Sequence, residues 1–125
     1  ARLASEAAIR YQQMGKWSKS EFKIKRILEM ELGLIEKIDY WHNFELKAPT
    51  GGIYHLDFYL PKWKLVIEAD SFWHDIGESP ERDKLRDDWV KEQLLCETMR
   101  FNRFGQKALA RIRKVLNKKI RGKEN

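Results

Sequence analysis

The stretch IYHLDFYLPKWKLVIEAD, residues 53–70, decides the fold of this 125-residue chain. Two segments rich in aromatic, β-branched and aliphatic residues flank a short turn, which is the pattern of a β-hairpin. If Lys62 and Trp63 form a two-residue loop, each residue lies opposite the one whose number brings the sum to 125. This register pairs Leu60 with Leu65, Tyr59 with Val66, and Asp57 with Glu68.

Three acids of the hairpin are expected to share one face. Side chains alternate along a strand, which sends Leu56, Phe58 and Leu60 to one side of the sheet. The other side receives Asp57, Glu68 and Asp70. Like charges at Cβ separations of roughly 5 Å destabilise a sheet, whereas a bound Mg²⁺ or Mn²⁺ would relieve the repulsion. A solvated face, with these acids paired to lysines of neighbouring elements, is the alternative.

The segment after the hairpin adds a histidine near the acids. Phe72-Trp73-His74-Asp75 follows Asp70 closely, and an imidazole there would titrate near neutral pH beside the carboxylates. A shift of the hairpin register by two residues would place Asp70 instead of Glu68 opposite Asp57. The cluster of acids would remain in either register.

Glu21 is the fourth candidate acid. It lies in a predicted helix whose start, Ser18-Lys19-Ser20-Glu21, has the S-x-x-E spacing of a capping box. Ile24 and Leu28 follow three and seven residues later, so Glu21 borders the apolar side of that helix. A role in the site and a role as the capping glutamate are equally good interpretations.

Periodicity and turn residues predict the remaining elements. We expect a helix over 18–33, strands over 38–47, 53–60 and 65–70, and a turn at 50–52. Ser79-Pro80 begins a second helix, whose apolar side would hold Leu85, Trp89, Val90 and Leu94. A strand over 98–104 and a helix over 106–121 complete the order α-β-β-β-α-β-α. This order predicts an α/β fold with a mixed sheet flanked by helices.

Composition limits the classes of protein to which the chain can belong. A mass of 15.0 kDa fits one domain, and a hydrophobic content of 42% suffices for a core. Cys96 is the single cysteine, which excludes a disulfide framework and a multi-cysteine zinc site and favours a reducing compartment. No apolar run exceeds three residues, so neither a membrane span nor a signal-peptide core is expected.

Positive charge is concentrated near the C-terminus. The chain has a net charge of +6, and residues 100–125 hold ten Lys or Arg and a single acid. Four of these cations fall on the side of the last predicted helix that faces away from its apolar residues. They are Lys107, Arg111, Lys114 and Lys118. Such a face suits the phosphates of a nucleic acid, and a solvated basic helix is the alternative.

Several of these segments resemble a nuclease family. DFYLP (residues 57–61), LVIEAD (65–70) and FWHD (72–75) are similar to segments of very-short-patch-repair (Vsr) endonucleases. Within that group the resemblance is greatest to homing endonucleases of phage and bacterial mobile elements, which are named for an EDxHD motif. Glu21, Asp57 and His74-Asp75 would form that motif. Arg82-Asp83, Arg86-Asp87 and Met99-Arg100-Phe101 resemble the helix and last strand of related nucleases, so the similarity covers about residues 18–104.

The resemblance implies a restriction-endonuclease-like core of the PD-(D/E)xK type and Mg²⁺-dependent hydrolysis of DNA phosphodiesters. It implies that His74 is the general acid or base. It places Phe72 and Trp73 where repair members wedge aromatic rings into the duplex, with a place in the core as the alternative. Repair members also have a cysteine-rich zinc site, which one cysteine cannot supply. The wider superfamily has a lysine where this chain has Asp70.

We therefore expect a metal-dependent endodeoxyribonuclease, the catalytic domain of a Vsr-like homing endonuclease. The catalytic residues would be Glu21, Asp57, His74 and Asp75. The ligands of Mg²⁺ or Mn²⁺ would be Asp57, Glu68 and Asp70, without a structural zinc. Double-stranded DNA would contact Phe72, Trp73, Lys107, Arg111, Lys114 and Lys118.

The expected organisation is an extension or linker over 1–17 and a nuclease domain over 18–125. Further recognition elements are expected outside this fragment, and a homodimer could form through them. No membrane contact is expected, and the expected location is the cytoplasm of a bacterial or phage-infected cell. The competing interpretations are a non-catalytic nucleic-acid-binding module on the same fold and a Vsr-like nuclease of repair or defence.

Overall fold

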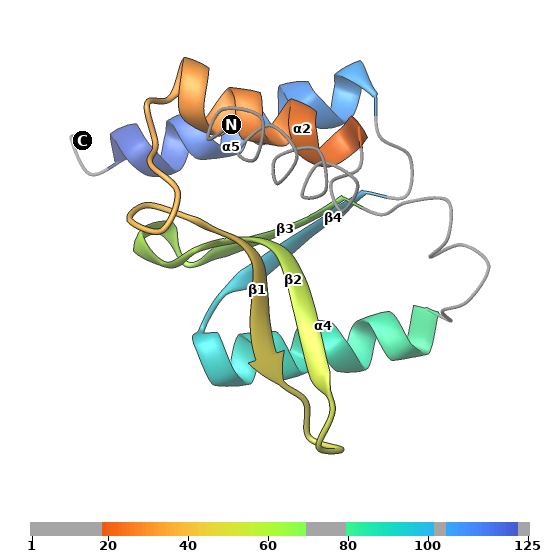
Figure 1. The fold of residues 1–125 in the computed structure, drawn as a ribbon. Helices are drawn as coiled ribbons and strands as arrows, with labels where there is room; N and C mark the ends of the chain where they lie inside the picture. Colours follow the sequence, from red (N-terminus) through yellow and green to blue (C-terminus); the bar gives the residue numbers. More distant parts are fainter. Residues whose placement is uncertain (1–18, 70–79, 102–104, 123–125) are drawn as a thin grey trace, which may run out of the picture.

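A four-stranded mixed sheet forms the centre of the fold (Figure 1). The computed structural model describes residues 19–69, 80–101 and 105–122. The strands are β1 (Trp41–Lys47), β2 (Ile53–Leu60), β3 (Leu65–Ala69) and β4 (Glu97–Phe101), in that spatial order. The first three are antiparallel neighbours, and β4 lies parallel to β3. The predicted mixed sheet is therefore confirmed.

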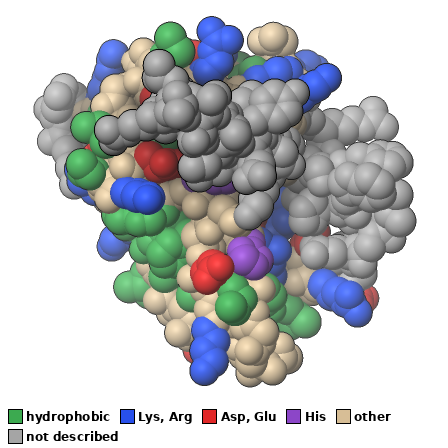
Figure 2. Space-filling model, viewed as in Figure 1, with side chains coloured by type: hydrophobic (Ala, Val, Ile, Leu, Met, Phe, Trp, Pro, Cys, Tyr) green, Lys and Arg blue, Asp and Glu red, His purple; other side chains and the backbone are tan. Residues whose placement is uncertain are grey.

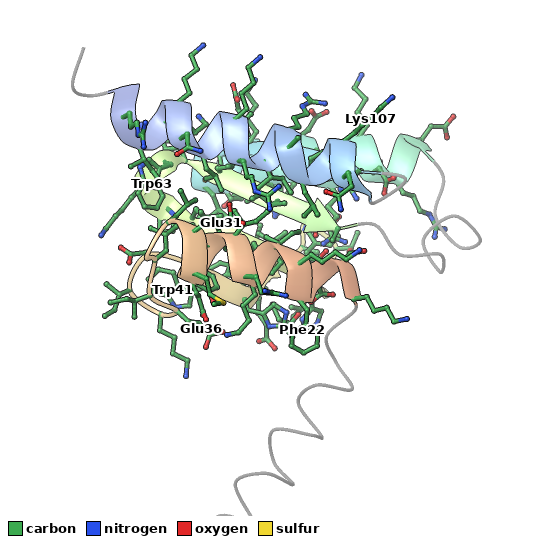
Figure 3. All side chains as sticks on the ribbon, turned by 90° about the horizontal axis from the view of Figure 1, so that it is seen from above. Phe22, Glu31, Glu36, Trp41, Trp63 and Lys107 are labelled. Atoms are coloured by element: carbon green, nitrogen blue, oxygen red, sulfur yellow. The ribbon has the colours of Figure 1, made fainter. Side chains whose placement is uncertain are left out.

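Helices lie on both faces of this sheet. On one face, α2 (Lys19–Arg26) and its π-helical continuation η1 (Ile27–Glu31) lie beside α5 (Gln106–Arg121), and both run in the same direction (Figures 1 and 3). On the other face lies α4 (Pro80–Leu94). This confirms the predicted order of elements and the α/β class. None of the helices in the described part of the chain has the length and apolar character needed to cross a membrane.

The first helix ends at the glycine that the sequence indicates. The Leu32 N–H donates to the Ile27 carbonyl and the Leu34 N–H to the Leu28 carbonyl, so the last turns are wider than α-helical ones. Gly33 follows with φ of +68°, a left-handed conformation that a Cβ disfavours. Ser18, the first residue of the predicted capping box, lies outside the described residues.

The hairpin has the predicted register but a longer connection. Leu60 pairs with Leu65 and Tyr59 with Val66. The prediction of a two-residue loop is wrong, because four residues connect the strands. A 3-10 turn, η2 (Pro61–Trp63), is followed by Lys64 with φ of +49°. The fixed φ of a proline suits the start of such a turn.

The prediction that Leu56 lies on the same side of the sheet as Phe58 and Leu60 is wrong. Phe58 lies in the core beneath α2 and α5, whereas Leu56 belongs with Val90 to a second apolar cluster beneath α4. The change of side falls at Asp57 and at Asn43, the residue opposite it on β1, which has φ of +54°. Here β1 and β2 bend away from β3 (Figure 1), and a strongly twisted ribbon does not keep a simple two-sided alternation. Asp57 therefore lies where the two clusters separate.

The two apolar clusters differ in size. The larger one fills the space between the sheet and the pair α2 and α5, and it includes the predicted apolar side of α5: Leu109, Ile112 and Leu116 are buried, and Ile120 is partly buried. The smaller one consists of Leu56, Val66, Val90 and Cys96. Each large apolar side chain contributes about 1.5–3 kcal/mol on full burial, so α4 has the weaker apolar attachment.

The boundaries of strands β1 and β4 and part of the apolar side of α4 differ from the predictions. β1 begins at Trp41 rather than at residue 38, because residues before it form a turn in which Lys37 has φ of +68°. β4 runs over Glu97–Phe101, and residues 102–104 of the predicted strand lie outside the described part. On α4, Leu85 is 68% exposed instead of buried, and Trp89 reaches sideways to donate to the Lys47 carbonyl (2.9 Å).

Candidate functional site

Asp57 and Glu68 form a carboxylate pair across the two central strands. The Asp57 N–H donates to Glu68 Oε2 (3.1 Å), and the Ala69 N–H donates to Asp57 Oδ2 (2.8 Å). These contacts lie just beyond the regular pair of Phe58 and Ile67, so the backbone fixes both side chains. Glu68 is 3% exposed and is the only charged residue in the described core. The predicted meeting of these two acids is confirmed.

Glu21 and His42 continue the site toward α2. Glu21 stands in the first turn of α2, and its Oε2 lies 2.6 Å from Nε2 of His42 on β1. The two side chains are 13% and 12% exposed, and the His42 ring contacts the ring of Phe58. The negative charge of Glu21 helps to raise the pKa of Asp57.

Arg86 lies at the opposite end of the site. Its Nη2 donates to Glu68 Oε1 (2.6 Å) and to the His55 carbonyl, and its guanidinium lies over the Tyr54 ring, 5.4 Å from the centroid. The sequence analysis did not assign Arg86 a role. Its spacing of four residues from the buried Val90 put it on the side of α4 that faces the sheet, and a charged residue there is the signal that could have found it.

A second set of charges also attaches α4 to the sheet. Arg100 on β4 donates to Asp87 Oδ1 (2.6 Å), and its Nη1 lies 3.7 Å from Asp83 Oδ1. Together with the Arg86–Glu68 pair, these contacts supplement the predicted apolar side of α4, of which Val90 is buried and Leu94 is partly buried. The small apolar cluster beneath the helix is consistent with this polar attachment.

His42, Glu21, Asp57, Glu68 and Arg86 thus form a row, which we call the acid row. Three carboxyl groups occupy its middle, with an imidazole at one end and a guanidinium at the other. The five side chains come from α2, β1, β2, β3 and α4, so the whole fold is needed to build it. With all three acids ionised and one guanidinium opposite them, the row has an excess of negative charge.

Burial and repulsion raise the pKa of the two central acids. Loss of hydration and the charge of Glu21 raise the pKa of Asp57 to about 6. Loss of hydration and the charge of Asp57 raise the pKa of Glu68 to about 8, against the opposing effect of Arg86. Both pKa values are therefore raised, because two buried carboxyl groups side by side resist being ionised together.

Two side chains of the acid row offer the type of donor that a hard divalent cation takes. The central donors are carboxylate oxygens, which Mg²⁺ and Mn²⁺ prefer, and the cation would remove the repulsion that raises these pKa values. Asp57 and Glu68 would hold the ion. Among the residues that the structure describes, no group of three or more His, Cys, Asp or Glu side chains is arranged to bind a metal. Asp70, the predicted third ligand, lies outside these residues.

Several other predicted site residues also lie outside the described residues: Phe72, Trp73, His74 and Asp75. Their roles stay predictions. The segment that contains them follows directly on Ala69, whose N–H binds Asp57, so the chain enters it from the acid row. Of the predicted catalytic residues that are described, Glu21 and Asp57 lie together at one site.

The four predicted DNA-binding cations of α5 are all exposed. Lys107, Arg111, Lys114 and Lys118 project from a helix that contains no acidic residue. Figure 2 shows Lys and Arg side chains gathered over the helices at the top of the molecule, and Figure 3 shows Lys107 near the start of α5. Arg113 instead binds Glu31 through Nε and Nη2 (2.8 and 2.9 Å), which ties α5 to the end of η1.

The raised pKa of Glu68 predicts how stability depends on pH. Between its usual pKa of 4.5 and about 8, Glu68 keeps a proton in the folded protein that the unfolded chain releases. The metal-free protein should therefore lose stability as the pH rises from 5 to 8. Glu68→Gln should reduce this loss, as measured by urea unfolding across that range.

The pH slope of stability is the informative quantity, because Glu68→Gln also changes the group to which Arg86 donates and so alters stability at every pH. Glu45→Gln, which removes an exposed carboxylate from β1, is the matched control and should keep the wild-type slope. Equal slopes for the wild type and Glu68→Gln would show that Glu68 ionises at its usual pH.

No protein-family model matches the chain, no curated protein is significantly similar to it in sequence, and no solved structure is significantly similar to its fold. The resemblance to Vsr-like nucleases therefore depends on the short motifs of the hairpin and of the segment that follows it. What the chain does must be inferred from the acid row and from the basic face of α5.

Proposed function

We propose that this chain is the catalytic domain of a metal-dependent DNA endonuclease of the Vsr-like homing type. The main support is the carboxylate pair of Asp57 and Glu68 with Glu21 beside it. Two adjacent buried acids whose pKa values are raised are unfavourable for stability alone, whereas phosphodiester hydrolysis uses such a cluster. A module that only bound nucleic acid would gain nothing from three acids facing a phosphate.

The proposed chemistry assigns a separate role to each part of the acid row. A Mg²⁺ ion held by Asp57 and Glu68 would neutralise charge on the phosphoryl oxygens and make a bound water more acidic. The backbone N–H groups of Asp57 and Ala69 fix the orientation of the two carboxylates before DNA arrives. His74 is the proposed proton-transfer residue, and Asp75 would orient its imidazole.

Double-stranded DNA is the proposed partner, and α5 is its proposed contact. An acid-free helix with four exposed cations along its outer face can follow a run of backbone phosphates. The contact would be independent of base sequence, because contacts to phosphates carry no direct information about the bases. Base recognition would need other groups.

Neutralising the basic face should weaken DNA binding and reduce its salt dependence. We expect the quadruple change of Lys107, Arg111, Lys114 and Lys118 to Gln to lower the slope of log K against log salt concentration by about 0.9 for each lost phosphate contact, roughly 3–4 in all. Fluorescence anisotropy with a labelled duplex at several salt concentrations measures this slope.

A matched control separates contact from overall charge. Changing Lys37, Lys47, Lys84 and Lys91 to Gln removes the same charge from exposed positions on other elements and should alter the slope much less. If both quadruple variants change the slope equally, α5 is not the DNA contact.

Cleavage of supercoiled plasmid tests the proposed function. The wild type should convert the plasmid to nicked or linear forms with Mg²⁺, and EDTA should prevent the conversion. Binding without cleavage in Mg²⁺ and in Mn²⁺ would instead identify a nucleic-acid-binding module on this fold. The Asp57→Asn variant should be purified and assayed in the same way. Equal activity of the two proteins would reveal a contaminating nuclease.

A further inference from the structure

We propose that His42 is a positioning residue for this reaction: it holds the Glu21 carboxylate beside Asp57. The inference rests on the proposed function and adds to it a residue that the EDxHD resemblance does not include. His42 lies outside the hairpin of residues 53–70 and the segment that follows it. It belongs to β1, a strand at one edge of the sheet.

The contact between the two side chains is short and sheltered. His42 Nε2 lies 2.6 Å from Glu21 Oε2, and both side chains are almost nine-tenths buried. An ionised carboxylate only accepts hydrogen bonds, so its contact with the imidazole requires a proton on Nε2. The Phe58 ring beside the imidazole limits the positions that the imidazole can take. Glu21 is thereby held at one place above the sheet.

The direction of the Glu21 side chain argues against a purely local role. The glutamate of a capping box reaches back to the backbone at the start of its own helix. Glu21 also reaches across to β1, and its charge acts on Asp57 of β2. Placing one carboxylate near another is unfavourable by itself, so a partner is needed to keep it there.

The backbone of β1 is distorted at the position that aims His42. Asn43 has φ of +54°, a conformation that few residues other than glycine adopt and that asparagine tolerates best. Across this residue the strand changes sides: the His42 ring contacts Phe58, whereas Phe44 packs with the cluster beneath α4. Without the distortion, His42 and Phe44 would face the same way. Strained backbone of this kind is often found at functional sites.

The test is a double-mutant cycle on cleavage under single-turnover conditions. His42→Leu should lower the rate at saturating DNA by about 10–100-fold, the usual effect of removing a partner that orients a site residue, and leave DNA affinity unchanged. His42→Gln should restore most of the rate, because its amide N–H can also donate to Glu21. In the Glu21→Gln background, His42→Leu should have little further effect.

The control is a comparable ion pair away from the acid row. Lys62 Nζ lies 2.6 Å from Asp39 Oδ1 at the other end of the hairpin, and Lys62→Leu should leave the rate unchanged. Melting temperatures of all variants show whether a lower rate reflects unfolding. The proposal fails if His42→Leu has the same effect with and without Glu21, or if His42→Gln is as slow as His42→Leu.

Failure of the proposed function gives a different result. If the wild type does not cleave DNA under any condition, the endonuclease assignment and the catalytic purpose of the pair are both wrong. The same four proteins then still test the contact through urea unfolding, in which the losses of stability from His42→Leu and Glu21→Gln should be non-additive. Additive losses would show that the two side chains do not interact.

Discussion

Asp57→Asn is expected to reduce Mg²⁺-dependent DNA cleavage by ~10²–10³-fold or more. Charge stabilisation by a bound metal contributes several kcal/mol to such reactions, and each 1.36 kcal/mol is a factor of ten in rate. The substitution removes a ligand charge but keeps the size of the side chain and an oxygen that can accept from the Ala69 N–H. The measurement is the single-turnover rate on a plasmid or a linear duplex.

The same variant should not be less stable without metal. Its neutral amide removes a charge that burial and the neighbouring Glu21 both disfavour, which are the causes that raise the pKa of Asp57, so the melting temperature should be unchanged or slightly higher. Glu45→Gln on the neighbouring strand β1 is the control for both measurements, since that carboxylate is exposed. Cleavage at the wild-type rate by Asp57→Asn would remove Asp57 from the site.

His74→Ala is expected to cut the cleavage rate by ~10²–10⁴-fold while DNA affinity changes little, because a positioned acid or base contributes a factor of that size. The wild-type rate should depend on pH near the imidazole pKa, and this dependence should vanish in the variant. Asp75→Asn should have a smaller effect if Asp75 orients the imidazole, and a larger one if it binds metal. Single-turnover rates across pH measure all three.

A histidine that only packs against the protein would behave differently. Its removal would lower the melting temperature, and the lost activity would follow the lost folded fraction. Rates and melting temperatures should therefore be taken on the same preparations. If His74→Ala is destabilised but its folded fraction cleaves normally, proton transfer must come from another residue.

The parts of the fold that depend on local pattern could be predicted from the sequence. The register of the hairpin follows from two hydrophobic segments around one turn, and the structure pairs Tyr59 with Val66 as expected. The order of elements and the buried face of α5 follow from periodicity. The meeting of Asp57 and Glu68 followed from that register alone, so the centre of the candidate site was predictable.

The parts that depend on tertiary contacts could not be predicted. Leu56 lies on a different side from Phe58 where β1 and β2 twist, at Asp57 and the left-handed Asn43, and nothing in the alternating pattern indicates such a twist. Arg86 donates to Glu68, a contact that appears only once α4 is placed against the sheet. His42 likewise gains a role only when α2 brings Glu21 above β1.

Calorimetric titration of Mn²⁺ into the metal-free wild type and into Asp57→Asn tests the central claim most directly. If the acid row is a cation site, the wild type should bind Mn²⁺ and release protons near pH 7, because the ion displaces the proton held by Glu68. Repeating the titration in buffers with different ionisation enthalpies counts those protons. Asp57→Asn should bind far more weakly. Equal Mn²⁺ affinity in the two proteins, or no binding by the wild type, would contradict the assignment of the acid row as a metal site.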